Sequence, residues 1–474
     1  MAGMVHDEGS SSVTSSPLQM FSLMSLSPGI GSPYPLLREV SPEDRGLWLI
    51  RYLVGCANLV AAGSVEDANL YLEQISHLAS PDGDAMQRIA AYFTEALADR
   101  ILKGWPALHK ALNSTKISLV SEEILVKRLF FELCPFLKLA YVITNQAILE
   151  AMEGEKMVHI IDLNSFEPAQ WINLLQSLKA RPEGPPHLRI TGVNEQKEVL
   201  DQMAFRLTEE AEKLDIPFQF NPVVCKLENL DLESLRKTGE ALAISSVLQL
   251  HTVLAADDET QRRTSPSASN SSNSSHRQRV LHMKQRTLGE WLQKEVVPLY
   301  CASPDSASAS SPLSCNLSPK MGSFLTSLWG LSPKLMVITE QESNHNGATL
   351  MERYVDALYF YGSLFDCLES TVPRASVERQ KVEKLLFGEE IKNIIASEGI
   401  QRKERHEKLE KWISRLELAG FGKVSLSYNG LLQAGMLLQS CGYDGYNLKE
   451  ENGCFFLCWH DKPLFSVSAW RFKR

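Results

Sequence analysis

The 474-residue chain lacks any run of about 18 consecutive apolar residues, so the sequence predicts no membrane-spanning helix. It also lacks an excess of positive charge: 48 Lys and Arg residues against 57 Asp and Glu residues give a net charge of −9. Proteins that bind mainly by neutralising nucleic-acid phosphates usually carry such an excess, so this class is disfavoured, with a local basic groove as the alternative. Residues 1–40 lack a basic segment followed by an apolar core, which argues against a secretory signal and leaves a transit peptide as the weaker alternative.

The nine cysteines show no disulfide framework, because their number is odd and their spacing is irregular. Free thiols in a reducing compartment are therefore expected. The nearest approach to a metal-binding pattern is Cys454-x3-Cys458-x-His460, whose side chains would share one face of a strand. A second ligand pair at finger spacing is missing, so buried packing of the two thiols is favoured over zinc. The sequence predicts neither a metal site nor a cofactor.

The chain contains enough apolar residues for a large core, with 44% hydrophobic and 22% charged residues. Residues 1–40 are rich in serine and interrupted by proline, which predicts a disordered tail. Apolar residues recur at helical spacing from 41 to 153, which predicts a helical cap. From 154 to 474, short apolar runs alternate with helical segments, which predicts a parallel sheet covered on both faces. Two serine-rich stretches within 257–320 predict a disordered insertion there.

Near the C-terminus the pattern changes to successive strands, and Asn452-Gly453 is a strong hairpin signal. The predicted fold class is α/β. A parallel sheet that ends in antiparallel strands is the layout of a Rossmann-like, class I methyltransferase-like three-layer core, here with an N-terminal helical cap and C-terminal antiparallel strands. Helices are expected at 227–236 and 402–418. Because the basic run at 402–406 is interleaved with acids, we interpret it as a solvated helix face.

The turn after the first predicted strand bears on catalysis. A cofactor-binding turn needs glycines so that the backbone can approach the cofactor closely. Residues 162–168 (DLNSFEP) contain no glycine, which argues against an enzyme. Asp162 and Glu195 follow adjacent strands, where ligands bind in open α/β sheets, so one interpretation is a residual crevice lined by both. The favoured alternative is that Asp162 caps the next helix or pairs with a buried arginine such as Arg189.

Large polar-tipped side chains inside the predicted elements are interpreted mainly as structural. His159 lies within the first apolar strand, where a hydrogen-bonded core histidine is more common than a general base. Tryptophan is enriched at interaction hot spots, so interface anchors are the alternative to packing. Packing is the favoured interpretation for Trp171, Trp329, Trp459 and Trp470.

Several motifs in order resemble those of the plant GRAS family, and the resemblance covers about 41 to 474 outside the serine-rich insertion. Gln170-Trp171 and LRITGV at 188–193 follow the first of these motifs, as in that family. The stretches RQKVEKLLF and GEEIKNIIASEG are similar to those of its scarecrow-like 3 branch. The residues that match named motifs are Val158, His159, Ile160, Ile161 and Asp162 (VHIID), Glu352, Arg353 and Tyr354 (PFYRE region), Val377, Glu378 and Arg379 (RVER-like), and Ser468, Ala469 and Trp470 (SAW).

The resemblance implies a nuclear, non-enzymatic transcriptional co-regulator in gibberellin signalling and root development. Its implied partners are other GRAS proteins of the DELLA and scarecrow types and indeterminate-domain zinc-finger transcription factors, with DNA contacted indirectly and no membrane association. Two alternatives stay open. One is an S-adenosylmethionine-dependent methyltransferase-like enzyme or small-molecule binder, and the other is a direct sequence-specific DNA binder.

Overall fold

The computed structural model describes residues 42–115, 119–235, 238–256, 319–442 and 444–473. The predicted tail at 1–40 and nearly all of the predicted insertion at 257–320 lie outside these residues. The described chain divides into two compact units, residues 42–95 and the rest, and each is described by itself.

The first unit is helical, as the apolar spacing predicts. Leu53 and Ile75, on different helices, are fully buried. Gly63 ends the first helix with a φ of 77°, a backbone conformation that favours glycine. The helices are α2 (Pro42–Ala62), α3 (Val65–Leu78) and the start of α4 (Ala85–Leu102), whose end belongs to the second unit.

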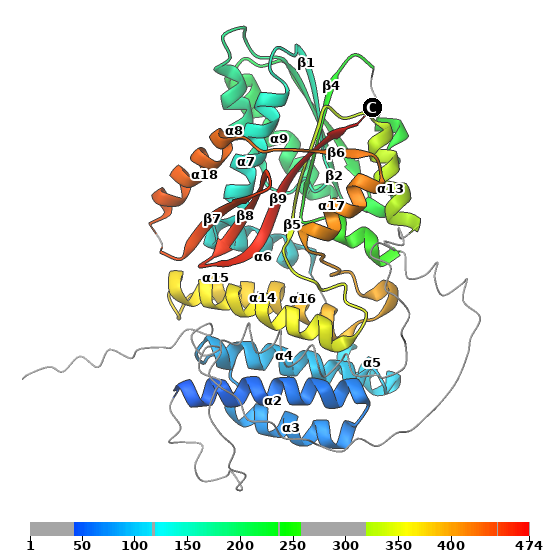
Figure 1. Cartoon of the computed structure of the whole chain (residues 1–474), viewed down its shortest axis with the longest axis vertical. Helices are drawn as coiled ribbons and strands as arrows, with labels where there is room; N and C mark the ends of the chain where they lie inside the picture. The colour runs from blue at the N-terminus through cyan, green and yellow to red at the C-terminus, as the bar shows by residue number, and fades with distance from the viewer. Residues whose placement is uncertain (1–41, 116–118, 236–237, 257–318, 443, 474) are drawn as a thin grey trace, which may run out of the picture. The chain divides into compact units, whose positions relative to one another are not determined.

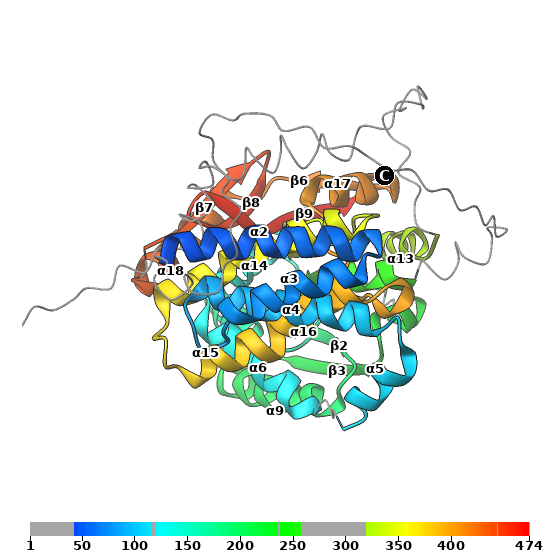
Figure 2. The ribbon, with the colours of Figure 1, turned by 90° about the horizontal axis from the view of Figure 1, so that it is seen from below.

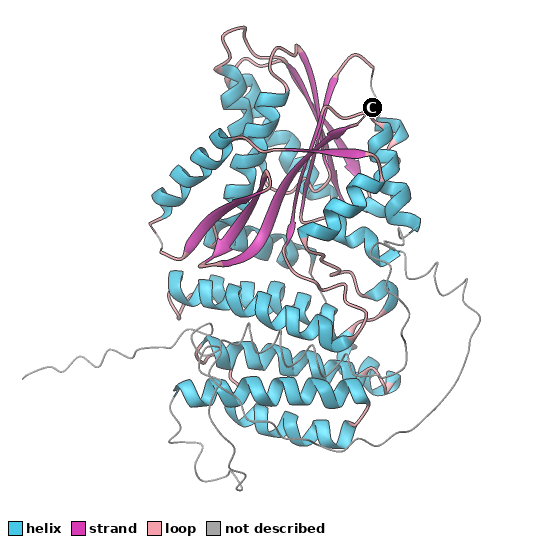
Figure 3. Ribbon diagram, in the orientation of Figure 1, coloured by secondary structure: helices cyan, strands magenta, loops and turns pink. Residues whose placement is uncertain are grey.

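The second unit is built on one nine-stranded sheet with the order β3-β2-β1-β4-β5-β9-β8-β7, in which β6 also pairs with β9 (Figure 3). β1 to β5 are parallel to one another, and β9 runs antiparallel to β5. The strands are β1 (Met157–Asp162), β2 (His187–Asn194), β3 (Phe218–Val224), β4 (Ala241–Val247), β5 (Leu335–Gln341), β6 (Phe421–Val424), β7 (Tyr446–Glu451), β8 (Cys454–Trp459) and β9 (Lys462–Phe472).

Helices of several lengths connect these strands. The α-helices are α5 (Pro106–Asn113), α6 (Val120–Leu133), α7 (Phe136–Ala151), α8 (Pro168–Lys179), α9 (Lys197–Lys213), α13 (Pro319–Gly330), α14 (Leu350–Thr371), α15 (Val377–Val382), α16 (Gly388–Ala396), α17 (Leu409–Leu418) and α18 (Tyr428–Cys441). Shorter turns are the 3-10 helices η2 (Leu227–Asn229), η3 (Glu233–Leu235), η4 (Leu250–Ala256) and η7 (Gly399–Gln401) and the π-helix η6 (Glu383–Phe387).

These helices make the unit three layers deep. α7 packs on β5, β8 and β9, while α9 packs on β2 and β3 at one edge of the sheet (Figures 1 and 2). On the opposite face, Leu325 of α13 and Trp412 of α17 join one buried cluster with Ile244 and Met336 of the sheet. α14, α15 and α16 lie past the ends of the strands (Figure 1). The predicted Rossmann-like α/β core with C-terminal antiparallel strands is confirmed.

The boundary of the helical cap differs from the expected range of 41–153. Helix α7 buries Phe136, Leu139 and Ile143, and it contacts strands of the sheet. Residues from 96 onward therefore belong to the α/β unit, and only residues 42–95 of the described chain form the separate helical one. The sequence pattern could not locate this division, because helices on a sheet and helices in a bundle share the same apolar period.

The predicted helix at 227–236 is also replaced by shorter turns. The carboxylate of Asp231 accepts hydrogen bonds from the backbone of Glu233 (3.2 Å) and Ser234 (3.4 Å). This side-chain turn competes with a continuous helix, so only η2 and η3 form.

The segment 402–408 is not helical, and our interpretation of 402–406 as a solvated helix face is wrong. Its chain has no regular secondary structure before α17 begins at Leu409. The side chains of Arg402, Arg405 and His406 are 5%, 3% and 0% exposed. Arg402 donates to the His345 carbonyl at 3.1 Å, a contact between segments far apart in the sequence. Three of the five side chains of this run therefore lie inside the fold, whereas Lys403 is exposed.

Candidate functional site

Strand β1 carries the VHIID residues to the centre of the sheet, where it pairs with β2 and β4. Residues 158–162 are all buried. The Nε2 atom of His159 lies 2.8 Å from Thr191 Oγ1, and its Nδ1 atom lies 3.3 Å from a carboxylate oxygen of Glu240. The interpretation of His159 as a hydrogen-bonded core residue is confirmed.

Asp162, at the end of β1, is held by Trp171 and not by the predicted Arg189. The indole Nε1 of Trp171 donates to Asp162 Oδ2 at 2.8 Å, and the backbone of Asn164 donates to Oδ1 at 3.2 Å. Arg189 pairs instead with Glu240 at 2.9 Å. Burial raises the pKa of Asp162 to about 6, although these hydrogen bonds lower it. Capping of α8 is done by Glu167, which accepts from Ala169, so both favoured roles for Asp162 were wrong.

The turn after β1 is closed by its own hydrogen bonds. The backbone amides of Leu163 and Ser165 donate to the carbonyls of Ser245 (2.9 Å) and Val193 (3.0 Å). The side chain of Asn164 donates to the Val247 carbonyl at 2.8 Å. These amides therefore point into the neighbouring strands β4 and β2. They are not available to a ligand at the carboxyl edge of the sheet.

The same turn packs tightly against β2. A side chain at Gly192 would place its Cβ 2.6 Å from Ser165 Oγ, which is closer than a Cβ atom approaches another heavy atom. Gly192 thus serves the close packing of the turn on the strand, a structural use of glycine. The absence of glycine from residues 162–168 and the presence of glycine opposite them have one cause: the turn folds down onto the sheet.

Two of the hollows at this edge bear on the predicted crevice. One, of about 350 Å³, is lined by Glu195 together with Asn164, Gln196 and Glu404, and Asp162 is not in its wall. The structure therefore does not bring Asp162 and Glu195 together in one crevice. The other, of about 170 Å³, is lined by residues that include Lys127, Phe166, Gln249, Glu390, Glu404 and His406.

A cluster of histidines and glutamates forms part of the smaller cavity's wall. His251 follows β4, and its Nδ1 atom lies 2.9 Å from Glu340 Oε2 at the end of β5. The Nε2 atoms of His251 and His406 lie 3.2 Å and 3.4 Å from the same oxygen, Glu404 Oε2. The Nδ1 atom of His406 lies 2.9 Å from that of His345. The three imidazoles are buried, and the cluster joins η4, β5 and the segment 402–408.

Charge is divided unequally within this cluster. Burial lowers the pKa of His251, but the charges of Glu340 and Glu404 outweigh burial and raise it to about 10. Burial and the charge of His251 lower the pKa of His345 to about 3, and the same causes hold the pKa of His406 well below its ordinary value. At neutral pH His251 therefore carries the positive charge, while the other two imidazoles are neutral.

Glu390 adds a further carboxyl group to the cavity wall. The hydroxyl of Tyr361 donates to its Oε2 at 2.7 Å. Burial, followed by repulsion from the charge of Glu404, raises the pKa of Glu390 to about 8. At neutral pH the cavity thus presents the neutral acid of Glu390, the ionised carboxylate of Glu404, the protonated imidazole of His251 and the neutral imidazole of His406. Of these groups, the carboxylate and the neutral imidazole are ready ligands for a cation.

The sequence pattern assigned none of these cluster residues to a site, and Glu404 and His406 entered only as part of the run at 402–406. His251 and Glu340 could have been found, because both sit where predicted strands end and ligands bind at carboxyl ends of parallel strands. Glu404 and His406 carried no such signal, because their neighbours have the alternating charges of a solvated helix. Only the tertiary structure places them beside His251.

The other motif residues are mainly structural. Glu352 closes a capping box with Thr349 at the start of α14, and Arg353 donates to the Ile394 carbonyl at 3.3 Å. Tyr354 is fully buried, and so are Ala469 and Trp470, which lie on β9 opposite β5 and β6. Within its own strand, Trp470 Nε1 donates to Ser468 Oγ at 2.9 Å.

The RVER-like residues divide between surface and core. Val377 is 55% exposed, and Glu378 is also exposed at the start of α15. Arg379 is 1% exposed and pairs with Glu383 at 3.3 Å and Glu369 at 3.4 Å. Roles of these motif residues in recognition stay predictions.

The cysteine pattern forms a strand contact. Cys454 and Cys458 are buried in one apolar cluster with Leu409 and Phe456, as the favoured interpretation predicts. His460 lies beyond the end of β8 in a turn, with a φ of 50°, so the three side chains do not share a strand face. Among the described helices, none is long and apolar enough to cross a membrane.

This architecture defines a methyltransferase-like α/β core whose first turn is closed. The sequence profile of the GRAS domain family matches residues 49–471. The chain is 62% identical over 476 residues to scarecrow-like protein 3 of Arabidopsis thaliana. This match covers 99% of this chain and 98% of the relative. It is 32% identical over 461 residues to DELLA protein GAI1 of Vitis vinifera, covering 95% and 66% of the two chains.

A solved structure agrees with these relatives. The crystal structure of SCL7 from Oryza sativa matches with a TM-score of 0.68 at 28% identity, covering 89% of this chain and 99% of that one. The chain belongs to the GRAS family. The predicted resemblance, including its scarecrow-like branch, is confirmed.

Proposed function

We propose that this GRAS protein is a non-enzymatic regulator of transcription that acts in the nucleus by binding other proteins. Its similarity to a scarecrow-like protein and to DELLA proteins supports a role in gibberellin signalling and root development. The observation that carries the non-enzymatic part is the closed turn after β1.

That turn argues against a nucleoside cofactor through its hydrogen bonds. In cofactor-binding α/β folds, glycines let backbone amides of this turn approach the ligand. Here the amides of Leu163 and Ser165 are bonded to strands, and Asn164 is bonded to Val247. A cofactor in the usual place would have to break these bonds, each of which contributes about 1 kcal/mol. A methyltransferase reaction is therefore disfavoured.

The helical first unit is our candidate for binding a second GRAS protein of the DELLA or scarecrow type. Its helices leave large apolar side chains in solvent: Leu70 is 58% exposed, and Trp48 and Val65 are each 37% exposed. Exposed apolar and aromatic residues are the usual anchors of protein interfaces. The α/β unit would then bind an indeterminate-domain zinc-finger factor, and that factor would contact DNA. A net charge of −9 supports an indirect route to DNA.

The partner surface can be tested in the full-length chain by Leu70→Asp. Because Leu70 is exposed, the substitution changes a surface without removing core packing. We expect co-purification of a DELLA or scarecrow-type protein to fall at least tenfold, about 1.4 kcal/mol. The matched control is Leu418→Asp, at a 55% exposed leucine of the second unit, which should bind normally. Undiminished binding by Leu70→Asp would rule out this surface.

Two further measurements separate this proposal from its alternatives. Calorimetric titration with S-adenosylmethionine should show no saturable heat, and saturable micromolar binding would restore the enzyme interpretation. A gel-shift experiment with the purified chain, repeated over a range of salt concentrations, should show weak and strongly salt-dependent binding. Tight sequence-specific binding without a partner would overturn the indirect route to DNA.

A further inference from the structure

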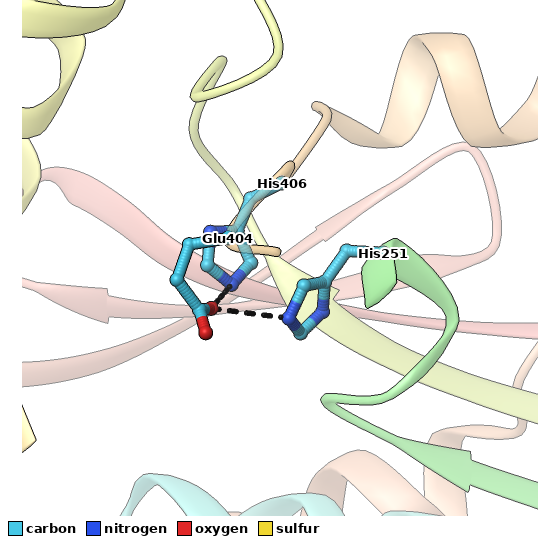
Figure 4. Close-up of side chains that lie close together, drawn as sticks. All are labelled: His251, Glu404 and His406. Carbon is cyan, nitrogen blue, oxygen red and sulfur yellow. Dashed lines mark ion pairs between the residues drawn. The ribbon is translucent and has the colours of Figure 1, made fainter. Parts of the chain in front are cut away.

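We propose that His251, Glu404 and His406 bind a divalent transition-metal ion, with zinc as the best fit, at the carboxyl edge of the sheet. The three side chains are turned toward one another, His251 from η4 and the other two from the segment 402–408 (Figure 4). This site is independent of the proposed partner surface and of the regulatory function.

The distances from Glu404 to the two histidines match a tetrahedral ion. Zinc bonds of about 2.0–2.1 Å to nitrogen and oxygen place two ligand atoms about 3.3–3.4 Å apart at a tetrahedral centre. Glu404 Oε2 lies 3.2 Å from His251 Nε2 and 3.4 Å from His406 Nε2. The candidate ligand atoms of all three residues lie within 4.8 Å of one another. Small rotations of these side chains would therefore complete three corners of a tetrahedron.

The Nδ1 atoms of His251 and His406, which face away from Glu404, already have polar partners. Metal-bound histidines nearly always use their second ring nitrogen to bond a carboxylate or another acceptor, which fixes the ring. Glu340 Oε2 accepts from His251 Nδ1 at 2.9 Å, and Glu340 Oε1 accepts from the backbone of Leu250 at 2.8 Å. His406 Nδ1 lies 2.9 Å from His345 Nδ1. Both Nε2 atoms are thereby aimed at Glu404.

One of the two Nε2 atoms that face Glu404 has no hydrogen-bond partner among the described residues. His406 Nε2 is buried and makes no hydrogen bond, although a carboxylate oxygen lies 3.4 Å away. A buried polar atom left unpaired costs about 1–3 kcal/mol. A metal ion between His406 and Glu404 would satisfy both. On binding, it would displace the Nε2 proton of His251 to solvent and supply the positive charge that Glu340 and Glu404 require.

The site has both an entry path and an open position. The Glu404 side chain is 22% exposed, so an ion can reach it from solvent. The cavity of about 170 Å³ borders all three ligands, and its volume can hold a water as the fourth ligand. η4 follows β4, and the segment 402–408 precedes α17. A bound ion would therefore link η4 to the segment 402–408, which is distant from it in the sequence. We assign it a structural role in fixing this edge.

Zinc and cobalt binding to the full-length protein tests the proposal. After removal of metals with a chelator, we expect the chain to take up one tightly bound Zn²⁺ and to unfold at a higher temperature with it. Glu404→Gln keeps the size of the side chain and should weaken Zn²⁺ binding by at least about tenfold. Circular dichroism checks that this variant is folded, and zinc should then raise its unfolding temperature less than that of the unchanged chain.

Controls separate this site from adventitious binding. Thr252→Ala alters the wall of the same cavity without removing a ligand and should bind Zn²⁺ like the unchanged chain. Cys458→Ser should also bind normally, and the Co²⁺ spectrum should lack a thiolate charge-transfer band, because the proposed ligands are nitrogen and oxygen. Equal affinity of Glu404→Gln and the unchanged chain, or thiolate bands with Co²⁺, would overturn the proposal.

Discussion

The indole nitrogen of Trp171 donates a 2.8 Å hydrogen bond to Asp162, which joins the end of β1 to helix α8. Both residues are buried, with Trp171 fully enclosed. In a cofactor-binding protein of this architecture, the acidic end of a strand is turned toward ligand. Here it is turned toward a core tryptophan. The pair therefore shows that the VHIID strand and the Gln170-Trp171 step act together as a packing unit.

The first prediction concerns the pH dependence that Asp162 brings. Burial raises its folded-state pKa to about 6 from 3.8, so the folded protein holds this proton more tightly than the unfolded chain. The stability linked to this proton is fully present below pH about 4 and is lost as pH rises to about 6, a change on the order of 3 kcal/mol. Asp162→Asn should remove this dependence.

Urea denaturation of both proteins at several pH values between about 4 and 8 measures the effect. The difference in unfolding free energy between Asp162→Asn and the unchanged chain should grow between pH about 4 and 6 and then level off. A constant offset would reflect only the lost acceptor for Trp171 or Asn164. Such parallel curves, with no growth of the difference between pH about 4 and 6, would show that Asp162 titrates normally.

Lys462 should show the opposite pH dependence. Its Nζ atom lies 4.1 Å from the ring centre of Tyr359, is buried, and has no hydrogen bond among the described residues. Burial lowers its pKa to about 7 from 10.5, despite the opposing charge of Asp356. The folded state therefore disfavours the proton, and stability should rise by on the order of 4 kcal/mol as pH increases from about 7 to 10.

Lys462→Met should flatten this rise in thermal or urea unfolding measured across the same pH range. The matched control is Lys449→Met, on strand β7, where the lysine pairs with the exposed Asp461. That variant should keep the slope of the unchanged chain. If both lysine variants retain the slope, another group is responsible for it.

The RVER-like residues should differ sharply from one another in their effect on stability. Arg379 is buried and pairs with buried Glu383, so Arg379→Ala leaves a carboxylate without this partner inside the fold. We expect a loss of about 3–5 kcal/mol in unfolding free energy. Glu378→Ala, one residue earlier and exposed, should leave the unfolding midpoint unchanged. A surface role for the whole motif predicts similar, small effects for both.

The capping box of α14 offers a smaller, local test. The Thr349 hydroxyl accepts from the backbone of Glu352 at 3.2 Å, and the Glu352 carboxylate accepts from the backbone of Thr349 at 3.2 Å. Thr349→Ala should cost about 1 kcal/mol. Thr326→Ala, in the exposed middle of α13, removes a hydroxyl without removing a cap and is the control. Equal losses would show that Thr349 is not acting as a capping residue.

Local patterns were sufficient for the elements and their order. The buried β1, the hairpin at Asn452-Gly453 with positive φ values of 53° and 79°, and the antiparallel C-terminal strands all follow from alternation, turn chemistry and apolar runs. The absence of glycine from the turn at 162–168 already argued against a cofactor, because it is a property of the backbone itself.

What the sequence by itself determined is therefore the α/β class, the family and the absence of glycine from the turn after β1. Only the tertiary structure decided which partner each buried charge has: Trp171 for Asp162, Glu240 for Arg189, and Glu404 for His251. The physical reason is the separation along the chain over which each effect acts. Periodicity and turn propensity act between neighbours in the chain, whereas a buried charge is stabilised by whichever group the fold brings within a few ångströms. For that reason Arg402, Arg405 and His406 resemble part of a solvated helix in sequence and are buried in the structure.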